Sequence, residues 1–437
     1  MALYLNTNRN LENYRELYNE EYFVDKSEII SLINKKINTK SKYLCITRPR
    51  RFGKSSIANM LGAYYSKAVD SKDIFDNLDV SNCESYEENL NKYNVITISF
   101  TDVNNNCKNC DEYIDRIIQL LIQDLKEVFP NIKIKPNYAI WDILNELNEK
   151  FIFIFDEWDY IFNRNLYLEE QDKFLEFLMK LLKDKSYVAL CYMTGILPIK
   201  KYSTGSALNM FDEYTFLKDR IFDEYFGFTS EEVISLCEKN DEIKFSELEN
   251  WYNGYLTIKG KKIYNPRSVV KALQNKHCES YWTNTGAMDE VAEYLKYNTM
   301  EIREDVIEMV SGGEIDIIIN EEFRAGQEAP KSKKEIYSAM IILGFLSYHD
   351  GYLKIPNKEL MLEFEKALAD ESLDIRKRGK SFIVELKKDE KVDIALTQIK
   401  EKEYVQKFKS ENNEVLAVAI CYDSKTKKHS CKIEKIQ

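Results

Sequence analysis

Histidine is scarce in this chain of 437 residues, and its scarcity argues against a large group of hydrolases. The three histidines are His277, His349 and His429. None of them accompanies a nucleophile motif in the sequence. Catalysis by a Ser–His or Cys–His pair is therefore not expected.

Long apolar runs are also missing. The longest, at residues 151–155 and 339–346, are far shorter than the roughly 20 residues that a membrane-spanning helix needs. The first ten residues lack the apolar core of a signal peptide. We therefore expect a cytoplasmic protein with no membrane partner.

The cysteines show no disulfide framework. There are nine, an odd number without regular spacing, which is typical of reduced thiols. Cys107 and Cys110 have Cys-x-x-Cys spacing, but a zinc site needs two further ligands and no second pair follows. A loop with two free thiols is the favoured interpretation, and a metal or redox pair is the alternative.

The composition is that of a globular protein, with 44% hydrophobic and 31% charged residues. The length suggests about three domains. The net charge of -11 argues against a basic coat that covers nucleic acid over the whole surface. Residues 371–437 differ from the rest in the sign of their charge, because they hold 16 basic and 12 acidic residues and so have a net charge of +4.

The order of apolar patterns predicts an α/β fold in three parts. Residues 1–228 alternate strands and helices, which is typical of a parallel sheet sandwiched by helices. Residues 229–357 are expected to be mostly helical, and residues 358–437 to form a small α/β module. The expected strands of the first part are at 43–47, 95–100, 151–155, 187–193 and 224–228. The expected helices include 55–66, 113–128, 230–238, 265–274, 288–297 and 333–342.

A phosphate-binding loop is predicted where the first strand meets the first of these helices. Backbone N–H groups of such a loop point at phosphate oxygens, Lys54 places its charge on the β- and γ-phosphates, and Ser55 can ligate Mg²⁺. The usual motif has glycine where this chain has Arg48. A basic turn on an acidic domain is the alternative. The candidate nucleotide-binding residues of the loop are Arg48, Pro49, Arg50, Arg51, Phe52, Gly53, Lys54, Ser55 and Ser56.

Two later strand ends supply the other parts of an ATPase site. Asp156 follows an apolar strand and is the candidate Mg²⁺ partner, and Glu157 would polarise the attacking water. An acidic helix start is the alternative for this pair. Thr194 ends the next strand, where it would act as a polar sensor of the γ-phosphate or would simply form a turn.

With these parts in place, the sequence resembles the AAA-ATPase-like family over roughly residues 15–350. In that family the loop also commonly lacks the first glycine. The resemblance implies a P-loop ATPase domain with a helical extension. The runs that carry it are 23–27, 48–55, 194–200, 206–211, 251–255, 264–266 and 281–285.

Several arginines are candidates for phosphate contacts. Arg50 and Arg51 lie in the loop itself. Arg220 and Arg267 are candidate arginine fingers, supplied by the helical part or by a neighbouring subunit of a homo-oligomer. Surface solvation is the plainer interpretation of each one alone.

A second chemical centre is predicted in the last part of the chain. Residues 373–387 read as a hairpin in which Asp374 can face Glu385 and Lys387. The last two lie two residues apart on one strand and so share a face. Two carboxylates beside a lysine can hold Mg²⁺ and activate water against a phosphodiester, so Asp374 and Glu385 are the candidate metal ligands.

The order of elements here resembles the PD-(D/E)xK nuclease superfamily. Gln398 and Tyr404 match a run of the branch that follows AAA-ATPase-like domains. Only a short segment separates Glu359 from Asp374, so the nuclease core is expected to be trimmed. The resemblance implies either a cleavage site or an inactive remnant kept for packing.

The combined prediction is an ATP- and Mg²⁺-dependent ATPase coupled to a nuclease-like module that acts on DNA or RNA. The alternative is an ATP-dependent switch whose tail binds nucleic acid or protein without cutting. A third interpretation, an interaction protein with a decayed P-loop, conflicts with the intact Gly53, Lys54 and Ser55.

Overall fold

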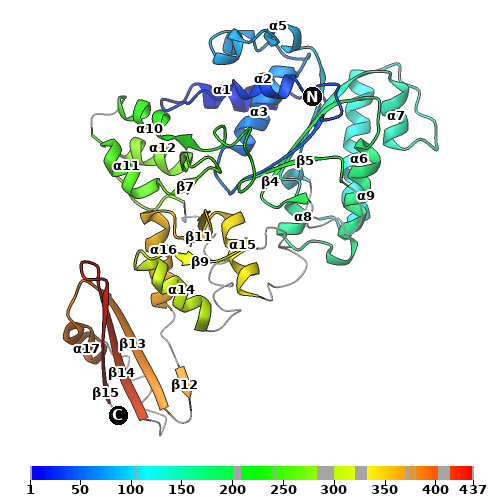
Figure 1. The fold of residues 1–437 in the computed structure, drawn as a ribbon. Coiled ribbons are helices and arrows are strands. Elements are labelled where there is room, and N and C mark those ends of the chain that lie inside the picture. Colours follow the sequence, from blue (N-terminus) through cyan, green and yellow to red (C-terminus); the bar gives the residue numbers. More distant parts are fainter. Residues whose placement is uncertain are drawn as a thin grey trace.

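A computed structural model of the chain describes residues 2–103, 106–199, 208–239, 242–282, 300–319, 332–370, 375–377, 380–401 and 414–435. Figure 1 shows a parallel sheet with its helices, a region of helices and small sheets, and a C-terminal sheet that lies apart from the first. The fold class is α/β, as predicted.

The first part is built on a five-stranded sheet in which every strand pair is parallel. The strand order is β2-β3-β4-β1-β5, so β4 lies between the strand that leads into the predicted P-loop and the strand that ends in Asp156. The strands are β1 (Tyr43–Thr47), β2 (Asn94–Ser99), β3 (Phe151–Asp156), β4 (Val188–Gly195) and β5 (Asp212–Thr215).

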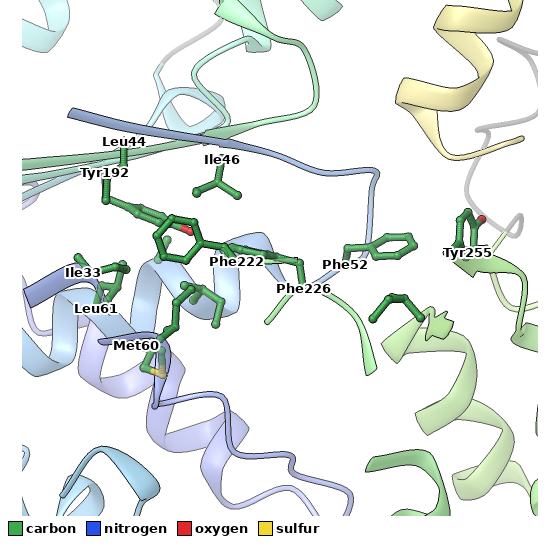
Figure 2. Close-up of a cluster of buried hydrophobic side chains, with 14 of the residues drawn as sticks. Ile33, Leu44, Ile46, Phe52, Met60, Leu61, Tyr192, Phe222, Phe226 and Tyr255 are labelled. Atoms are coloured by element: carbon green, nitrogen blue, oxygen red, sulfur yellow. The ribbon is translucent and has the colours of Figure 1, made fainter. Parts of the chain in front are cut away.

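Side-chain alternation along these strands divides the apolar core between the two faces of the sheet. In β1, Leu44 and Ile46 belong to one cluster and Tyr43 and Cys45 to the other. Continuous apolar strands such as β3 are expected where both faces are covered. Figure 2 shows part of the first cluster: Ile33, Leu44, Ile46, Met60, Leu61, Tyr192, Phe222 and Phe226.

Helices cover both faces. Those that contribute to the first cluster are α1 (Arg9–Tyr18), α2 (Ile29–Asn34), α3 (Lys54–Tyr65), α4 (Lys72–Phe75) and α5 (Tyr86–Asn89). Those that contribute to the second are α6 (Cys110–Val128), α7 (Ile140–Glu146), α8 (Tyr160–Asn163) and α9 (Gln171–Leu182). The N-terminal segment extends the sheet edge, where Leu5 forms an antiparallel bridge with Ile96.

The fifth strand corrects one prediction. Residues 224–228 do not join the parallel sheet, and β5 takes the edge beside β1 instead. Phe228 begins β6 (Phe228–Thr229), which belongs to a small separate sheet. The sequence signal failed because β5 is polar and partly exposed, whereas Phe226 and Phe228 are buried without pairing into this sheet.

The middle region contains more strand than expected. Its helices are α10 (Ser230–Cys237), α11 (Phe245–Tyr252), α12 (Pro266–Asn275), α14 (Met300–Val310) and α15 (Lys333–Leu343). Two antiparallel sheets accompany them, with orders β6-β8-β7 and β10-β11-β9. Their other strands are β7 (Tyr255–Leu256), β8 (Lys262–Tyr264), β9 (Ile315–Asp316), β10 (Ser347–His349) and β11 (Tyr352–Lys354). The helix expected at 288–297 lies outside the described residues.

The last part follows the predicted order of elements and adds a final strand. Its elements are α16 (Lys358–Asp370), β12 (Ile375–Lys377), β13 (Lys380–Lys388), α17 (Val392–Glu401), β14 (Glu414–Asp423) and β15 (Lys428–Lys435). β12 and β13 pair antiparallel, as the hairpin prediction requires, and β13 and β14 pair parallel. Within the described ranges, no helix combines the length and the apolar character needed to cross a membrane.

Candidate functional site

The predicted phosphate-binding loop connects the buried strand β1 to α3. Gly53 caps α3 in the left-handed conformation, with φ 84°, and Arg51 also has a positive φ of 68°. The first amides of α3, from Lys54 onward, have no acceptor within the helix, because an α-helix leaves its first four N–H groups unpaired. The loop therefore directs backbone donors and the positive helix end to one point.

Arg48 is used differently from the prediction. Its guanidinium is buried, with 1% exposure, and forms an ion pair with Asp219. It also donates to the carbonyls of Thr47 and Tyr214, both at 2.8 Å, and its backbone N–H donates to Gly195 O. Arg48 thus stabilises the base of the loop and does not offer its side chain to a phosphate.

Pro49 and Phe52 also face the protein rather than a ligand. Phe52 is fully buried and packs edge-to-face on Tyr255, with ring centroids 5.1 Å apart (Figure 2). Pro49 lies against Gly344, where a Cβ would come within 2.6 Å of the proline ring. The side chains of these two loop residues therefore join the P-loop to the middle region.

Lys54 lies against the loop and binds two of its carbonyl oxygens. Its Nζ donates to the carbonyls of Arg48 at 3.0 Å and Pro49 at 2.8 Å. Burial lowers the pKa of Lys54 to about 8, against the opposing pull of nearby carboxylates, the strongest of which is Asp156. The lysine is held beside an acidic cluster in a partly desolvated place.

Asp156 and Ser55 are hydrogen-bonded to each other through their side chains. Burial raises the pKa of Asp156, while a hydrogen bond from the Ser55 side chain and the charge of Lys54 oppose the rise. Hydroxyl and carboxylate oxygens are the donors that Mg²⁺ accepts beside substrate phosphates. These two groups fit a magnesium ion, and Ser56 follows on α3 as a half-buried residue.

Glu157 has the backbone strain that often marks a functional position. Its φ is 50°, in a region that costs a non-glycine residue free energy. Burial and the charge of Asp156 raise its pKa, and Lys54 opposes them. A carboxylate with a raised pKa is a better proton acceptor near neutral pH.

Thr194 is the penultimate residue of β4, the strand between β1 and β3. Ile46 pairs with Thr194 on one side of β4, and Phe155 pairs with Met193 on the other. The Thr194 hydroxyl is buried, and no hydrogen-bond partner reaches it within the part of the chain that the structure describes. An unpaired buried hydroxyl is costly and calls for an explanation.

Asp159 was missed by the sequence analysis. Its buried carboxylate accepts hydrogen bonds from the amides of Ile196 at 2.9 Å and Leu197 at 2.7 Å, and from Asn163 at 2.8 Å. A Cβ on Gly195 would lie 2.6 Å from Asp159 Oδ1, so only glycine fits there. Asp159 thus fixes the loop after Thr194 to the loop after Glu157. In the sequence, the feature that could have drawn attention to Asp159 is its position three residues after Asp156.

A cavity of about 240 Å³ adjoins the acidic pair. Ser55, Asp156, Glu157, Asn10 and Thr97 are among the residues that line it. It offers space for water next to Glu157.

The remaining candidate arginines differ in position: Arg50 and Arg267 lie near Arg51, whereas Arg220 is not among its neighbours in the described part of the chain. Arg51 donates to the carbonyl of Tyr281 at 2.8 Å. Its pKa is lowered by burial and then by the nearby charge of Arg267, with Arg50 adding to the effect, so Arg51 lies close enough to each of the other two to be repelled by it. Arg220 is exposed and follows the partner of Arg48 in sequence.

The C-terminal site is described only in part. Glu385 and Lys387 lie on β13, with their charged atoms 3.7 Å apart, and Asp374 and Tyr404 lie outside the described residues. Ile383 of β13 packs with Leu396 and Ile399 of α17, so α17 covers the face that carries Glu385 and Lys387. Gln398 Oε1 is buried without a partner among the described residues.

No three His, Cys, Asp or Glu side chains come together as a metal site among the described residues. Cys107 and Cys110 are among the residues searched, and both are free thiols. Burial raises the pKa of Cys110 to about 11, so the thiol remains protonated at neutral pH.

Family comparisons support both halves of the sequence prediction. A family model described as predicted AAA-ATPase matches residues 10–204. A family model for the PD-(D/E)XK nuclease superfamily matches residues 333–431, beginning ahead of the boundary expected at 358. The chain therefore carries an AAA-ATPase-like domain and a nuclease-superfamily domain.

Similar proteins include an uncharacterized protein in the vnfD 5′ region of Azotobacter chroococcum mcd 1. It is 24% identical over 277 residues, which are 61% of this chain and 51% of that protein, so this chain spans about half the length of its curated relative. A Walker-type ATPase of Pyrococcus abyssi has 12% identity and a TM-score of 0.44, covering 80% of this chain and 99% of that one. The ORC2 protein of Aeropyrum pernix has 12% identity and a TM-score of 0.37, covering 82% and 98%.

Proposed function

We propose that this chain, in which an AAA-ATPase-like domain precedes a PD-(D/E)XK nuclease superfamily domain, binds and hydrolyses ATP and couples hydrolysis to its C-terminal module. The observation that carries the proposal is the cluster of Lys54, Ser55, Asp156 and Glu157 at the carboxyl end of the parallel sheet. In it, Ser55 is hydrogen-bonded to Asp156, and Lys54 lies within their electrostatic reach.

Each residue has a role that follows from its chemistry. The amides at the start of α3 and the Lys54 ammonium bind the phosphate chain. Glu157 accepts a proton from the attacking water, which the adjoining cavity admits. The unpaired Thr194 hydroxyl donates to the γ-phosphate or to that water. Arg267, which lies near Arg51, is the candidate finger supplied from the middle region.

Ser55 and Asp156 would hold Mg²⁺ together with phosphate oxygens and water. The ion, when bound, neutralises charge on the phosphates. The chain contributes the orientation of Ser55, which the hydrogen bond to Asp156 fixes.

The test is ATP turnover by the full chain with Lys54→Ala and Glu157→Gln. Lys54→Ala should weaken nucleotide binding and abolish hydrolysis, because the phosphate charge loses its partner. Glu157→Gln should retain binding and lose turnover. Lys40→Ala removes an exposed lysine and serves as the matched control. Turnover unchanged by Lys54→Ala would overturn the assignment.

The C-terminal module is proposed to act on DNA or RNA through Glu385 and Lys387, with Asp374 as the second carboxylate. A binding module without cleavage is the second candidate, because only a short segment separates Glu359 from Asp374 in the sequence. Fluorescence polarisation of labelled DNA and RNA, followed by a gel in Mg²⁺ or Mn²⁺, separates the two. Cleavage lost in Glu385→Gln supports a nuclease, and binding without nicking supports the second candidate.

A further inference from the structure

A carboxylate from outside the ATPase match lies close behind the P-loop. Glu359 is fully buried and belongs to the first turn of α16, within the segment that matches the nuclease superfamily. It accepts hydrogen bonds from the amides of Tyr281 at 2.7 Å and Trp282 at 2.6 Å. The Ser268 hydroxyl reaches its two oxygens at 3.0 and 2.9 Å. Three donors thus converge on one buried acceptor.

This arrangement suits an ionised carboxylate. A buried charge is tolerated when hydrogen bonds and an opposite charge compensate for its lost hydration. The donors above supply the hydrogen bonds, and Arg51 supplies the opposite charge. Burial raises the pKa of Glu359, and the hydrogen bonds and Arg51 oppose that rise.

The same network reaches the P-loop through one main-chain unit. Arg51 donates to the carbonyl oxygen of Tyr281, while the amide of Tyr281 donates to Glu359. Arg51 is the loop residue with a φ of 68°, a conformation that needs support from its surroundings. Two further contacts, Pro49 against Gly344 and Phe52 against Tyr255, hold the loop to the same region.

We propose that Glu359 is a positioning residue for the nucleotide site: through Tyr281 and Arg51 it holds the P-loop in the conformation that binds phosphate. The inference rests on the proposed ATPase function and adds a residue from the nuclease-matching segment to it. It gives the C-terminal part of the chain a physical connection to nucleotide affinity. By linkage, a change in the position of α16 and a change in nucleotide occupancy must affect each other.

The test compares Glu359→Gln, Arg51→Gln and the double variant in the full chain, with steady-state ATP kinetics and the Kd of a fluorescent ATP analogue. Each single variant should raise KM and Kd about tenfold, the effect expected from losing one hydrogen bond to a charged group. The value of kcat at saturating ATP should change less than about twofold, because Lys54 and Glu157 are untouched. The double variant should be no weaker than the worse single variant, since both interrupt one network.

Glu365→Gln is the matched control, because it removes an exposed carboxylate from the same helix. If Glu359→Gln does not fold, Ser268→Ala removes one of the donors to Glu359 and should raise KM about threefold, the effect of a weaker neutral hydrogen bond.

Three results would overturn the inference. Tighter nucleotide binding in Glu359→Gln would mean that its charge merely repels phosphate. A lower melting temperature with unchanged KM would mean a purely structural role. Additive effects in the double variant would mean that Arg51 and Glu359 act separately. A wild-type chain that binds no nucleotide would overturn the proposed function itself, whereas Lys54-dependent binding that ignores Glu359 would overturn this inference alone.

Discussion

Nucleotide binding should take up protons near pH 8, because of the environment of Lys54. Burial lowers the pKa of this ammonium to about 8 in the free protein. Phosphate oxygens bring negative charge to it and favour the protonated form, so its pKa rises when nucleotide binds. The phosphates do not compete for this proton, since their own pKa is near 6.

The magnitude follows from the titration of one group. With a pKa of about 8, roughly half of the free protein carries a neutral Lys54 at pH 8, about a tenth at pH 7 and about nine tenths at pH 9. Binding should therefore take up about 0.5 proton at pH 8, about 0.1 at pH 7 and about 0.9 at pH 9. Nucleotide affinity should fall above pH 8, by at most about tenfold per pH unit.

Isothermal titration calorimetry in two buffers of different ionisation enthalpy measures the uptake at each pH. Lys54→Arg is the control, because a guanidinium stays protonated throughout this range and should abolish the uptake. Equal uptake at pH 7 and pH 9, or uptake that persists in Lys54→Arg, would refute the reasoning.

The lowered pKa of Lys54 also affects the stability of the free protein, and this effect has the opposite pH dependence to nucleotide affinity. The unfolded chain binds more protons than the native state between about pH 8 and 10.5, so the contribution of Lys54 to stability grows with pH in that window.

Three further predictions concern stability around the site. Asp159→Ala leaves the amides of Ile196 and Leu197 unpaired and should lower the free energy of unfolding by about 3 kcal/mol in urea titrations; a loss below about 1 kcal/mol would contradict the hydrogen bonds described. Gly195→Ala forces a methyl group against Asp159 and should lower the free energy of unfolding by about 1–3 kcal/mol. The same variant should have reduced ATP turnover, and full activity in the folded variant would contradict this prediction. Arg48→Gln should cost about 3–5 kcal/mol of folding free energy by leaving Asp219 buried without its counter-charge, whereas loss of nucleotide affinity without loss of stability would indicate a phosphate contact instead.

The sequence predicted the central strands of the sheet because buried strands consist of short runs of apolar residues. Strand β3 is a continuous apolar run, and burial on both faces requires such a run. Strand β5 escaped prediction because it is polar and gains its place from pairing with β1. The strands of the two small sheets are two or three residues long, which is too short for periodicity to be detected.

The site was predictable where one motif contains the chemistry and unpredictable where distant segments meet. Lys54 comes shortly after β1 and Asp156 ends β3, and parallel strands bring their carboxyl ends to one edge of the sheet. Arg48 was misread because a loop arginine resembles a phosphate ligand until its partner Asp219 is placed. The contact of Glu359 with the P-loop region could not be predicted from the sequence, since its three donors lie more than 70 residues away.

The partner of Arg48 also bears on where the folding unit ends. The ATPase family match stops at residue 204, but β1 completes its pairing with β5 at residues 212–215, and the buried guanidinium is neutralised by Asp219. During synthesis β1 cannot pair with its neighbours β4 and β5 until they have been made, and they follow it by more than 140 residues. Such non-local pairing slows folding and prolongs exposure of apolar strands. A fragment cut at residue 204 would retain every nucleotide-binding residue proposed for this loop and yet contain a buried arginine without its counter-charge.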